Sequence, residues 1–174
     1  MNRRLILMRH AKSSWKRGPS DDHERPLNER GRRSARLVGA RLSERGWIPE
    51  LVCSSDSVRT RETWKHLRAA FGDAHIDVRF TPELYLAGMP ELRRLSKSFD
   101  PAIETVLALG HNPGFELALA ELSGEAERMT TANAALLSGT GESWAASLRG
   151  PWSLMELIRP RELESRFRDA TGES

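Results

Sequence analysis

Apolar and polar positions follow two patterns along this chain. Uninterrupted apolar runs occur at residues 5–8 and 105–109, and each is only long enough for a strand buried on both faces. Between such runs, apolar residues recur at helical spacing, as Ala35, Val38 and Leu42 do, or Trp64 and Leu67. Alternating strands and helices predict an α/β fold, a three-layer sandwich with a mostly parallel central sheet and helices on both faces.

The boundaries of these elements follow from the residues that start and stop them. Strands are expected at residues 5–8, 51–54, 76–80, 105–109, 134–137 and 152–158. Asn28 is a candidate N-cap of a helix that Gly46 ends, and a second helix is expected to end at Gly72. Further helices are expected from Pro90 and after Gly114, whereas residues 138–143 are predicted to be a turn rich in glycine and serine.

Two of the expected strands end in a histidine. Arg9 and His10 follow the first apolar run, and Gly110 and His111 follow the run at 105–109. Open α/β sheets bind their ligands at the carboxyl ends of the strands, so both imidazoles are expected at one edge. Residues 12–26 form a long polar loop after the first strand, and loops of that length in compact domains are usually functional.

Histidines and arginines in this arrangement suit phosphoryl transfer. The transition state spreads charge over three equatorial oxygens, which the planar guanidinium group can hold by paired hydrogen bonds. A neutral imidazole nitrogen can attack phosphorus and carry the group covalently. His10 is therefore a candidate nucleophile beside Arg9, and His111 a second hydrogen-bond donor.

Composition narrows the class of protein. With 174 residues the chain has the length of one domain, which we place at residues 1–160, followed by a charged C-terminal tail at 161–174. The single cysteine, Cys53, excludes an internal disulfide, and no apolar run approaches the length of a membrane span or a signal peptide. A cytoplasmic protein away from membranes is therefore expected.

A net charge of +3 from intermixed charges is too small to indicate nucleic-acid binding but fits an anion site. The spacing of histidines and Cys53 matches no metal site, and neither a metal nor another cofactor is expected.

Four segments carry a family resemblance: RHA at 9–11, RPLNERG at 25–31, SSDSVRTRET at 54–63 and GHNPG at 110–114. In this order and spacing the chain resembles the histidine phosphatase superfamily, and within it the small phosphohistidine phosphatases of the SixA type, over about residues 3–160. The resemblance implies a phosphoglycerate mutase-like fold. It makes His10 the phosphorylated nucleophile and places Arg9, Arg59 and His111 in the phosphate pocket.

The sequence departs from the family pattern at two positions. Asp56 stands where a proline is usual, and Leu86 stands where many relatives carry a glutamate that acts as general acid, so Glu83 is the nearest candidate for that role. A phosphate ester expels an alkoxide that needs a proton from such an acid, whereas phosphohistidine expels an imidazole of near-neutral basicity. The pattern therefore favours a phosphoramidate substrate.

Three functions stay open at this point. The first is a protein phosphohistidine phosphatase working through a phosphohistidine intermediate on His10, with a phosphorylated protein as partner. The second is a phosphomonoesterase acting on a small phosphorylated molecule, and the third a non-catalytic phosphate-binding module on the same fold. If His10 is the nucleophile, activity should fall at low pH as its imidazole is protonated.

Other residues of types that often act in functional sites are expected to be structural or solvated, with Trp15 the one exception. Cys53 and Trp64 are expected in the core, Arg61 in solvent, and Asp21 and Asp22 in a turn. His23, His66 and His75 are expected to be structural or solvated. Trp15 is expected either to wall the phosphate pocket or to pack under the loop at 12–26.

Overall fold

The computed structural model of the protein describes residues 1–15 and 22–171, with side chains as far as residue 165. The central part of the predicted loop at 12–26, which includes Asp21, lies outside the described residues, and so does the end of the predicted tail.

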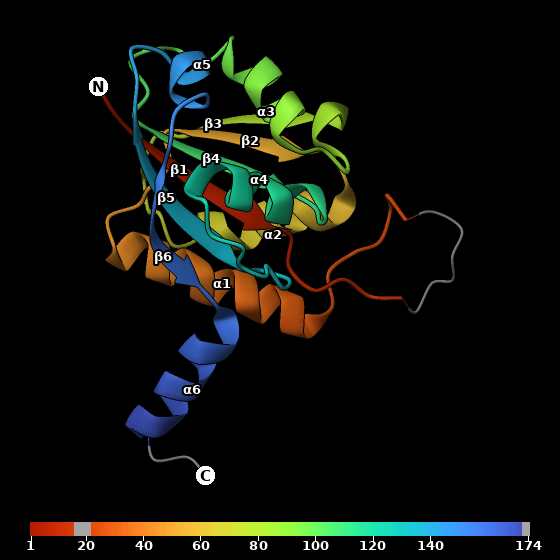
Figure 1. The fold of residues 1–174 in the computed structure, drawn as a ribbon. Coiled ribbons are helices and arrows are strands. Elements are labelled where there is room, and N and C mark those ends of the chain that lie inside the picture. Colours follow the sequence, from red (N-terminus) through yellow and green to blue (C-terminus); the bar gives the residue numbers. More distant parts are fainter. Residues whose placement is uncertain (16–21, 172–174) are drawn as a thin grey trace.

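A mixed sheet forms the centre of the molecule (Figure 1). Its strands within the described residues are β1 (Asn2–Arg9), β2 (Leu51–Ser55), β3 (Asp77–Thr81), β4 (Thr105–Gly110), β5 (Ala134–Thr140) and β6 (Ser153–Ile158). Their order across the sheet is β3-β2-β4-β1-β5-β6. The four strands from β3 to β1 are parallel, whereas β5 runs antiparallel to β1, and β6 antiparallel to β5.

Helices cover both faces of this sheet (Figure 1). They are α1 (Glu29–Glu44), α2 (Val58–Arg68), a 3-10 turn η1 (Pro82–Leu84), α3 (Met89–Ser96), α4 (Gly114–Ser123), α5 (Trp144–Ser147) and α6 (Pro160–Thr171). The predicted N-cap of the first helix is confirmed, since Asn28 Oδ1 accepts from the Gly31 amide at 2.8 Å. The predicted three-layer α/β sandwich is confirmed as well.

The buried strands supply side chains to both layers, as the continuous apolar runs predict. Leu5 and Leu7 of β1 pack with the cluster of α3, α4 and α5, whereas Ile6 and Met8 pack with α1 and α2. Cys53 is buried in the first of these clusters, and Trp64 in the second, as expected. In the described part of the chain no helix combines the length and the apolar character needed to cross a membrane.

Two of the boundaries predicted from the sequence are wrong. The second helix, expected to end at Gly72, ends at Arg68. Residues 138–140, predicted to begin a turn, continue β5 as far as Thr140. Gly139 permits this because a Cβ there would lie 2.5 Å from the indole of Trp152, which packs flat on the strand. Here glycine marks a close approach inside a strand and not a turn.

Candidate active site

His10 and His111 lie side by side at the carboxyl ends of adjacent strands. Arg9 of β1 pairs with Gly110 of β4, so the residues that follow each strand meet at the same edge of the sheet. The ring centroids of His10 and His111 are 5.1 Å apart. The backbone of His10 is held on both sides, because its amide donates to the Gly110 carbonyl at 3.0 Å and its carbonyl accepts from the Ala132 amide at 3.0 Å.

Arg59 reaches this edge from the first turn of α2. Its Nη2 donates to Nδ1 of His111 at 3.2 Å. Because a guanidinium group has only donors, Nδ1 of His111 must accept, and the proton of a neutral ring is then on Nε2. That nitrogen lies 2.9 Å from Oγ of Ser55, at the end of β2, and donates to it. Three parallel strands thus contribute to one cluster.

The hydrogen bond of His10 selects its tautomer. Nδ1 of His10 lies 2.7 Å from the carbonyl oxygen of Ala11. A carbonyl only accepts, so Nδ1 carries the proton and Nε2 of the neutral ring keeps its lone pair. Burial lowers the pKa of His10 to about 3, an effect to which the nearby cations Arg59, Arg9 and Arg25 add and which the bond to Ala11 opposes. The ring is therefore neutral at neutral pH.

The three arginines that act on His10 also carry unsatisfied donors. Among the described residues, Nε of Arg9, Nε of Arg59 and Nη1 of Arg25 are buried and have no hydrogen-bond partner. The guanidinium group of Arg9 is otherwise held by one bond from Nη1 to the Met129 carbonyl at 3.0 Å. Buried donors without partners are costly, so three of them around one imidazole fit a site that receives an anion.

A cavity of about 210 Å³ opens beside His10. It is lined by Arg9, His10, Lys12, Ser13, Trp15, Arg25 and Thr131, and we call it the His10 cavity. Trp15 lines the cavity, as one of the two positions expected for it requires, and its side chain is 69% exposed. The Arg25 guanidinium carbon lies 3.6 Å from the centre of the indole ring, within cation–π distance.

Sequence reasoning missed two further residues at this edge. Oδ2 of Asp22 accepts from Nη2 of Arg59 at 2.9 Å and from the Tyr85 hydroxyl at 2.5 Å, and Arg59 also donates to the Asp22 carbonyl. Oδ1 of Asp22 forms an ion pair with Arg25 at 2.9 Å. The hydrogen bond from Tyr85 lowers the pKa of Asp22 below its usual value, as do the charges of Arg59 and Arg25. The Tyr85 ring contacts that of His111, with centroids 5.1 Å apart.

Glu83, the candidate general acid, lies apart from this cluster. It is exposed in η1, and Oε2 accepts from Nε of Arg94 at 3.0 Å. It does not line the His10 cavity. The structure thus brings His10, His111 and Arg59 into contact, adds Arg9 at the cavity wall, and directs Glu83 to the surface. No group of His, Cys, Asp and Glu able to hold a metal ion occurs in the described ranges.

Comparisons with known proteins place this arrangement in a family. The family model of the histidine phosphatase superfamily (branch 1) matches residues 5–86. An uncharacterized chloroplastic protein of Arabidopsis thaliana is 43% identical over 172 residues, which are 92% of this chain and 79% of the relative. The chain belongs to the histidine phosphatase superfamily. It is therefore a phosphatase.

The fold of this histidine phosphatase is similar to that of solved SixA structures. A SixA structure from Nakamurella multipartitia, assigned as a phosphohistidine phosphatase, has a TM-score of 0.79 at 29% identity. The match covers 92% of this chain and 97% of that one. A second SixA structure, from Agrobacterium tumefaciens and assigned in the same way, has a TM-score of 0.76 at 28% identity, over 91% of this chain and 98% of that one. The predicted SixA-type membership and phosphoglycerate mutase-like fold are confirmed.

The sequence of this histidine phosphatase gave little indication that Tyr85 and Asp22 belong to the candidate site. Tyr85 is the chain's single tyrosine, and it follows a weakly patterned strand with no repeat or spacing that points to the site. Asp22 was predicted to form a turn, because aspartate in a Gly/Pro/Ser-rich loop usually does. The one available signal was its position in a long loop directly after the strand that carries His10.

Proposed function

We propose that this chain is a protein phosphohistidine phosphatase that works through a covalent phosphohistidine on His10. The observation that carries the proposal is the tautomer of His10: Nδ1 is bonded to the Ala11 carbonyl, so the lone pair of Nε2 is available beside a cavity walled by arginines. A neutral imidazole with a free nitrogen is the nucleophile that phosphoryl transfer requires.

The reaction on this geometry has two displacements. In the first, the lone pair of His10 Nε2 forms a bond to phosphorus while the bond to the leaving nitrogen of the substrate breaks, and that nitrogen keeps the electron pair and takes a proton from solvent. In the second, water attacks the same phosphorus, releases inorganic phosphate and returns His10 to its neutral form. Arg9, Arg59 and Arg25 would hold the three equatorial oxygens in both steps, and their unpaired buried donors support this role.

The carboxylates near the site favour a phosphoramidate over a phosphate ester. Asp22, in contact with Arg59, has a pKa lowered by the hydrogen bond of Tyr85, so it is ionised at neutral pH and holds no proton to give. Glu83 is paired with Arg94 at the surface. An alkoxide leaving group needs an acid, whereas the imidazole of a phosphohistidine is protonated readily from water. The likeness to SixA structures supports the same choice.

Replacing His10 tests the covalent step. His10→Ala should reduce hydrolysis of a phosphohistidine peptide at least about a thousandfold, because it removes the nucleophile. It should also abolish acid-labile labelling of the chain by radioactive phosphoryl donor. His75→Ala, at a histidine side chain that is 97% exposed, is the matched control and should keep both. Full labelling of the His10→Ala chain would refute the assignment.

The substrate class is tested by comparing leaving groups. We expect the wild type to cleave a phosphohistidine peptide much faster than the matching phosphoserine peptide or a sugar phosphate. Glu83→Gln settles the question of the acid: if Glu83 supplies the proton, hydrolysis of esters should collapse while that of the phosphoramidate survives. Faster cleavage of esters by the wild type would overturn the proposed substrate class.

A further inference from the structure

A second pocket adjoins the His10 cavity. It has a volume of about 290 Å³ and lies between the N-terminal ends of α1 and α6. Its lining includes Lys12, Arg30, Ser34, Thr131, Asn133 and Arg161, and we call it the α1–α6 pocket. Lys12 and Thr131 also line the His10 cavity, so the two cavities share a wall.

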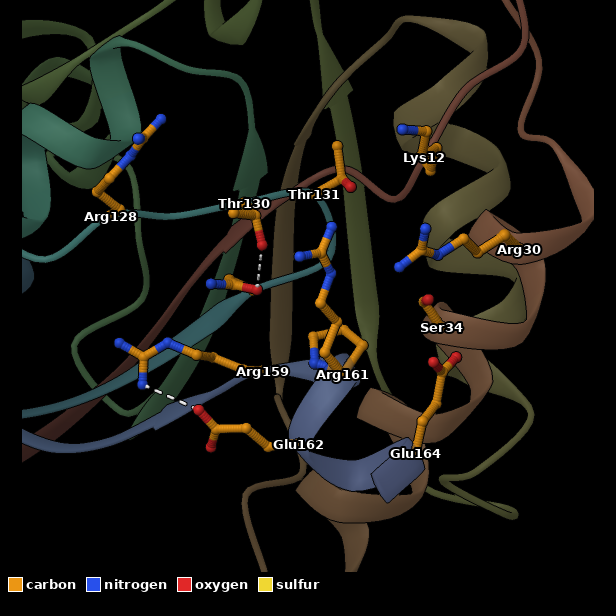
Figure 2. Close-up of a pocket in the computed structure, with 12 residues that line it drawn as sticks. Lys12, Arg30, Ser34, Arg128, Thr130, Thr131, Arg159, Arg161, Glu162 and Glu164 are labelled. Carbon is orange, nitrogen blue, oxygen red and sulfur yellow. Dashed lines mark hydrogen bonds and ion pairs between the residues drawn. The ribbon is translucent and has the colours of Figure 1, made fainter. Parts of the chain in front are cut away.

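The α1–α6 pocket has a surplus of positive charge. In Figure 2 the side chains of Arg30 and Arg161 extend toward the space between α1 and α6 from opposite sides, with Lys12 nearby. Within the described residues none of these three cations has an ion-pair partner, although eight other arginines do. Cations that face one another repel, and an anion between them removes that repulsion.

The two carboxylates of the α1–α6 pocket do not cancel this charge. Glu164 forms an ion pair with Arg33 at 3.4 Å, and Arg33 is not among the lining residues. Glu162 lies 3.6 Å from Arg159, which pairs more closely with Glu127, at 2.8 Å. Arg159 and Arg128 are two further cations of the lining. The lining thus has five cations against two carboxylates, and neither carboxylate forms an ion pair with Lys12, Arg30 or Arg161 within the described residues.

A buried neutral donor also belongs to this pocket. Asn133 is 1% exposed, and its Oδ1 accepts from the Thr130 hydroxyl at 3.0 Å, whereas its Nδ2 has no partner among the described residues. An unpaired buried amide donor is uncommon, because the lost hydration is not replaced. Pro160 and Arg161 of the first turn of α6 also line this pocket, so the positive end of the helix dipole lies beside it. All of these features suit an anion.

The turn that carries Asn133 fixes the pocket relative to His10. The Ala132 amide donates to the His10 carbonyl, and the Arg9 amide donates to the Asn133 carbonyl at 3.1 Å. Ala132 has a φ of 63°, in the left-handed region, and is fully buried. A non-glycine residue keeps such a conformation only where its surroundings enforce it. One rigid turn therefore joins the two cavities, and a ligand bound at His10 can extend past Thr131.

We propose that the α1–α6 pocket binds a second anionic group of the substrate, separate from the phosphoryl group that reacts at His10. This inference rests on the proposed function and specifies its substrate further. The anion could be the carboxylate of an acidic residue near the phosphohistidine of a protein, or a second phosphate on a small molecule. Both offer oxygens to the same donors.

The test compares substrates with and without the second anion. One arm uses phosphohistidine peptides whose flanking residues are either acidic or the matching amides, and the other uses a hexose bisphosphate and the monophosphate with the same reacting group. Each pair is measured with the wild type, with Arg30→Gln/Arg161→Gln, and with Arg36→Gln/Arg149→Gln. The last variant removes the same net charge from two exposed arginines outside the pocket. A ratio of kcat/KM within one variant cancels any general loss of activity.

We expect the wild type to prefer the doubly anionic substrate about tenfold in one arm, which corresponds to about 1.4 kcal/mol. The preference should fall below about twofold in Arg30→Gln/Arg161→Gln, stay near tenfold in the control, and return in part in Arg30→Lys/Arg161→Lys, which keeps the charges. The arm that shows the preference identifies the source of the anion.

Absence of a preference in both arms, or an equal preference in the pocket variant and the control, overturns the inference. Failure of the proposed function is separate: the wild type would then not hydrolyse the phosphohistidine peptides, and the sugar arm alone would decide the role of the pocket.

Discussion

Acidification should destabilise the folded chain through its two buried imidazoles. His10 and His111 are 6% and 2% exposed, and the pKa of each is lowered from 6.5 to about 3. Burial is the largest cause for both. For His111 the neighbouring His10 and the Arg59 cation add to the effect, and for His10 the arginines do. In the unfolded chain both rings return to ordinary values.

The sign of the effect follows from which state binds the proton first. Since the folded-state pKa is the lower one, the unfolded chain is protonated first as the pH falls. Stability is complete above about pH 6.5 and is lost progressively between there and about pH 3. From about pH 7 to about pH 5, a shift of this size costs about 2 kcal/mol for each ring, or about 4 kcal/mol for the pair. That is a large fraction of the stability of a typical domain.

Urea denaturation at both pH values measures this difference, in buffers without phosphate, because bound phosphate would itself stabilise the fold. The wild type is compared with His10→Asn and His111→Asn, in which the replaced ring no longer titrates, and with His75→Asn, whose original side chain is exposed. Titration of carboxylates elsewhere is common to all four proteins and cancels in the comparison.

Each buried-site variant should lose about 2 kcal/mol less than the wild type between the two pH values, and His75→Asn should follow the wild type. The same pKa values imply that His10 stays neutral well below pH 6, so the expected fall of activity should begin only near pH 4. Identical pH dependence of stability in the wild type and both buried-site variants would refute the reasoning.

Three substitutions around the site have further expected outcomes. Tyr85→Phe removes the hydroxyl that holds Asp22, so the pKa of that carboxylate should rise toward its usual value, as NMR titration can follow; an unchanged pKa would count against the bond. Thr63→Val removes the acceptor of the Ala11 amide, leaves a buried donor unpaired and should cost about 1–3 kcal/mol in urea denaturation; a neutral effect would contradict it. Gly114→Ala would place a Cβ 1.9 Å from a backbone oxygen of the loop after η1, and should lower the melting temperature markedly in a thermal scan; an unchanged melting temperature would show that the approach is not tight.

The local pattern of the chain was sufficient for the strands, for the four helices α1 to α4 and for the sheet edge where the candidate site lies. The apolar runs that precede Arg9 and Gly110 could only be buried strands, and the polar residues after them had to lie at a sheet edge. The pairing of these two strands, however, joins residues about a hundred positions apart, and nothing in the periodicity of either strand specifies it. That the two strand ends lie together was inferred only from the resemblance to the histidine phosphatase superfamily.

Side-chain direction was the part that sequence could not give. Glu83 and Tyr85 are two positions apart, yet one pairs with Arg94 at the surface and the other reaches Asp22 and His111. Their short 3-10 turn has no apolar periodicity from which an inward face could be read. The role of Asp22 depended on Arg59, which comes from a helix far along the chain. Such contacts follow from tertiary packing, which local patterns do not encode.

The position of β4 between β1 and β2 has a consequence for folding. β4 is synthesised long after β1 and β2, which flank it in the sheet. His10, after β1, and Arg59, after β2, can therefore come together only once β4 has paired with both strands. Contacts of such wide sequence separation form slowly and late. No partly formed intermediate should therefore hold phosphate, and tight retention of the ion would report that the last central strand has been inserted.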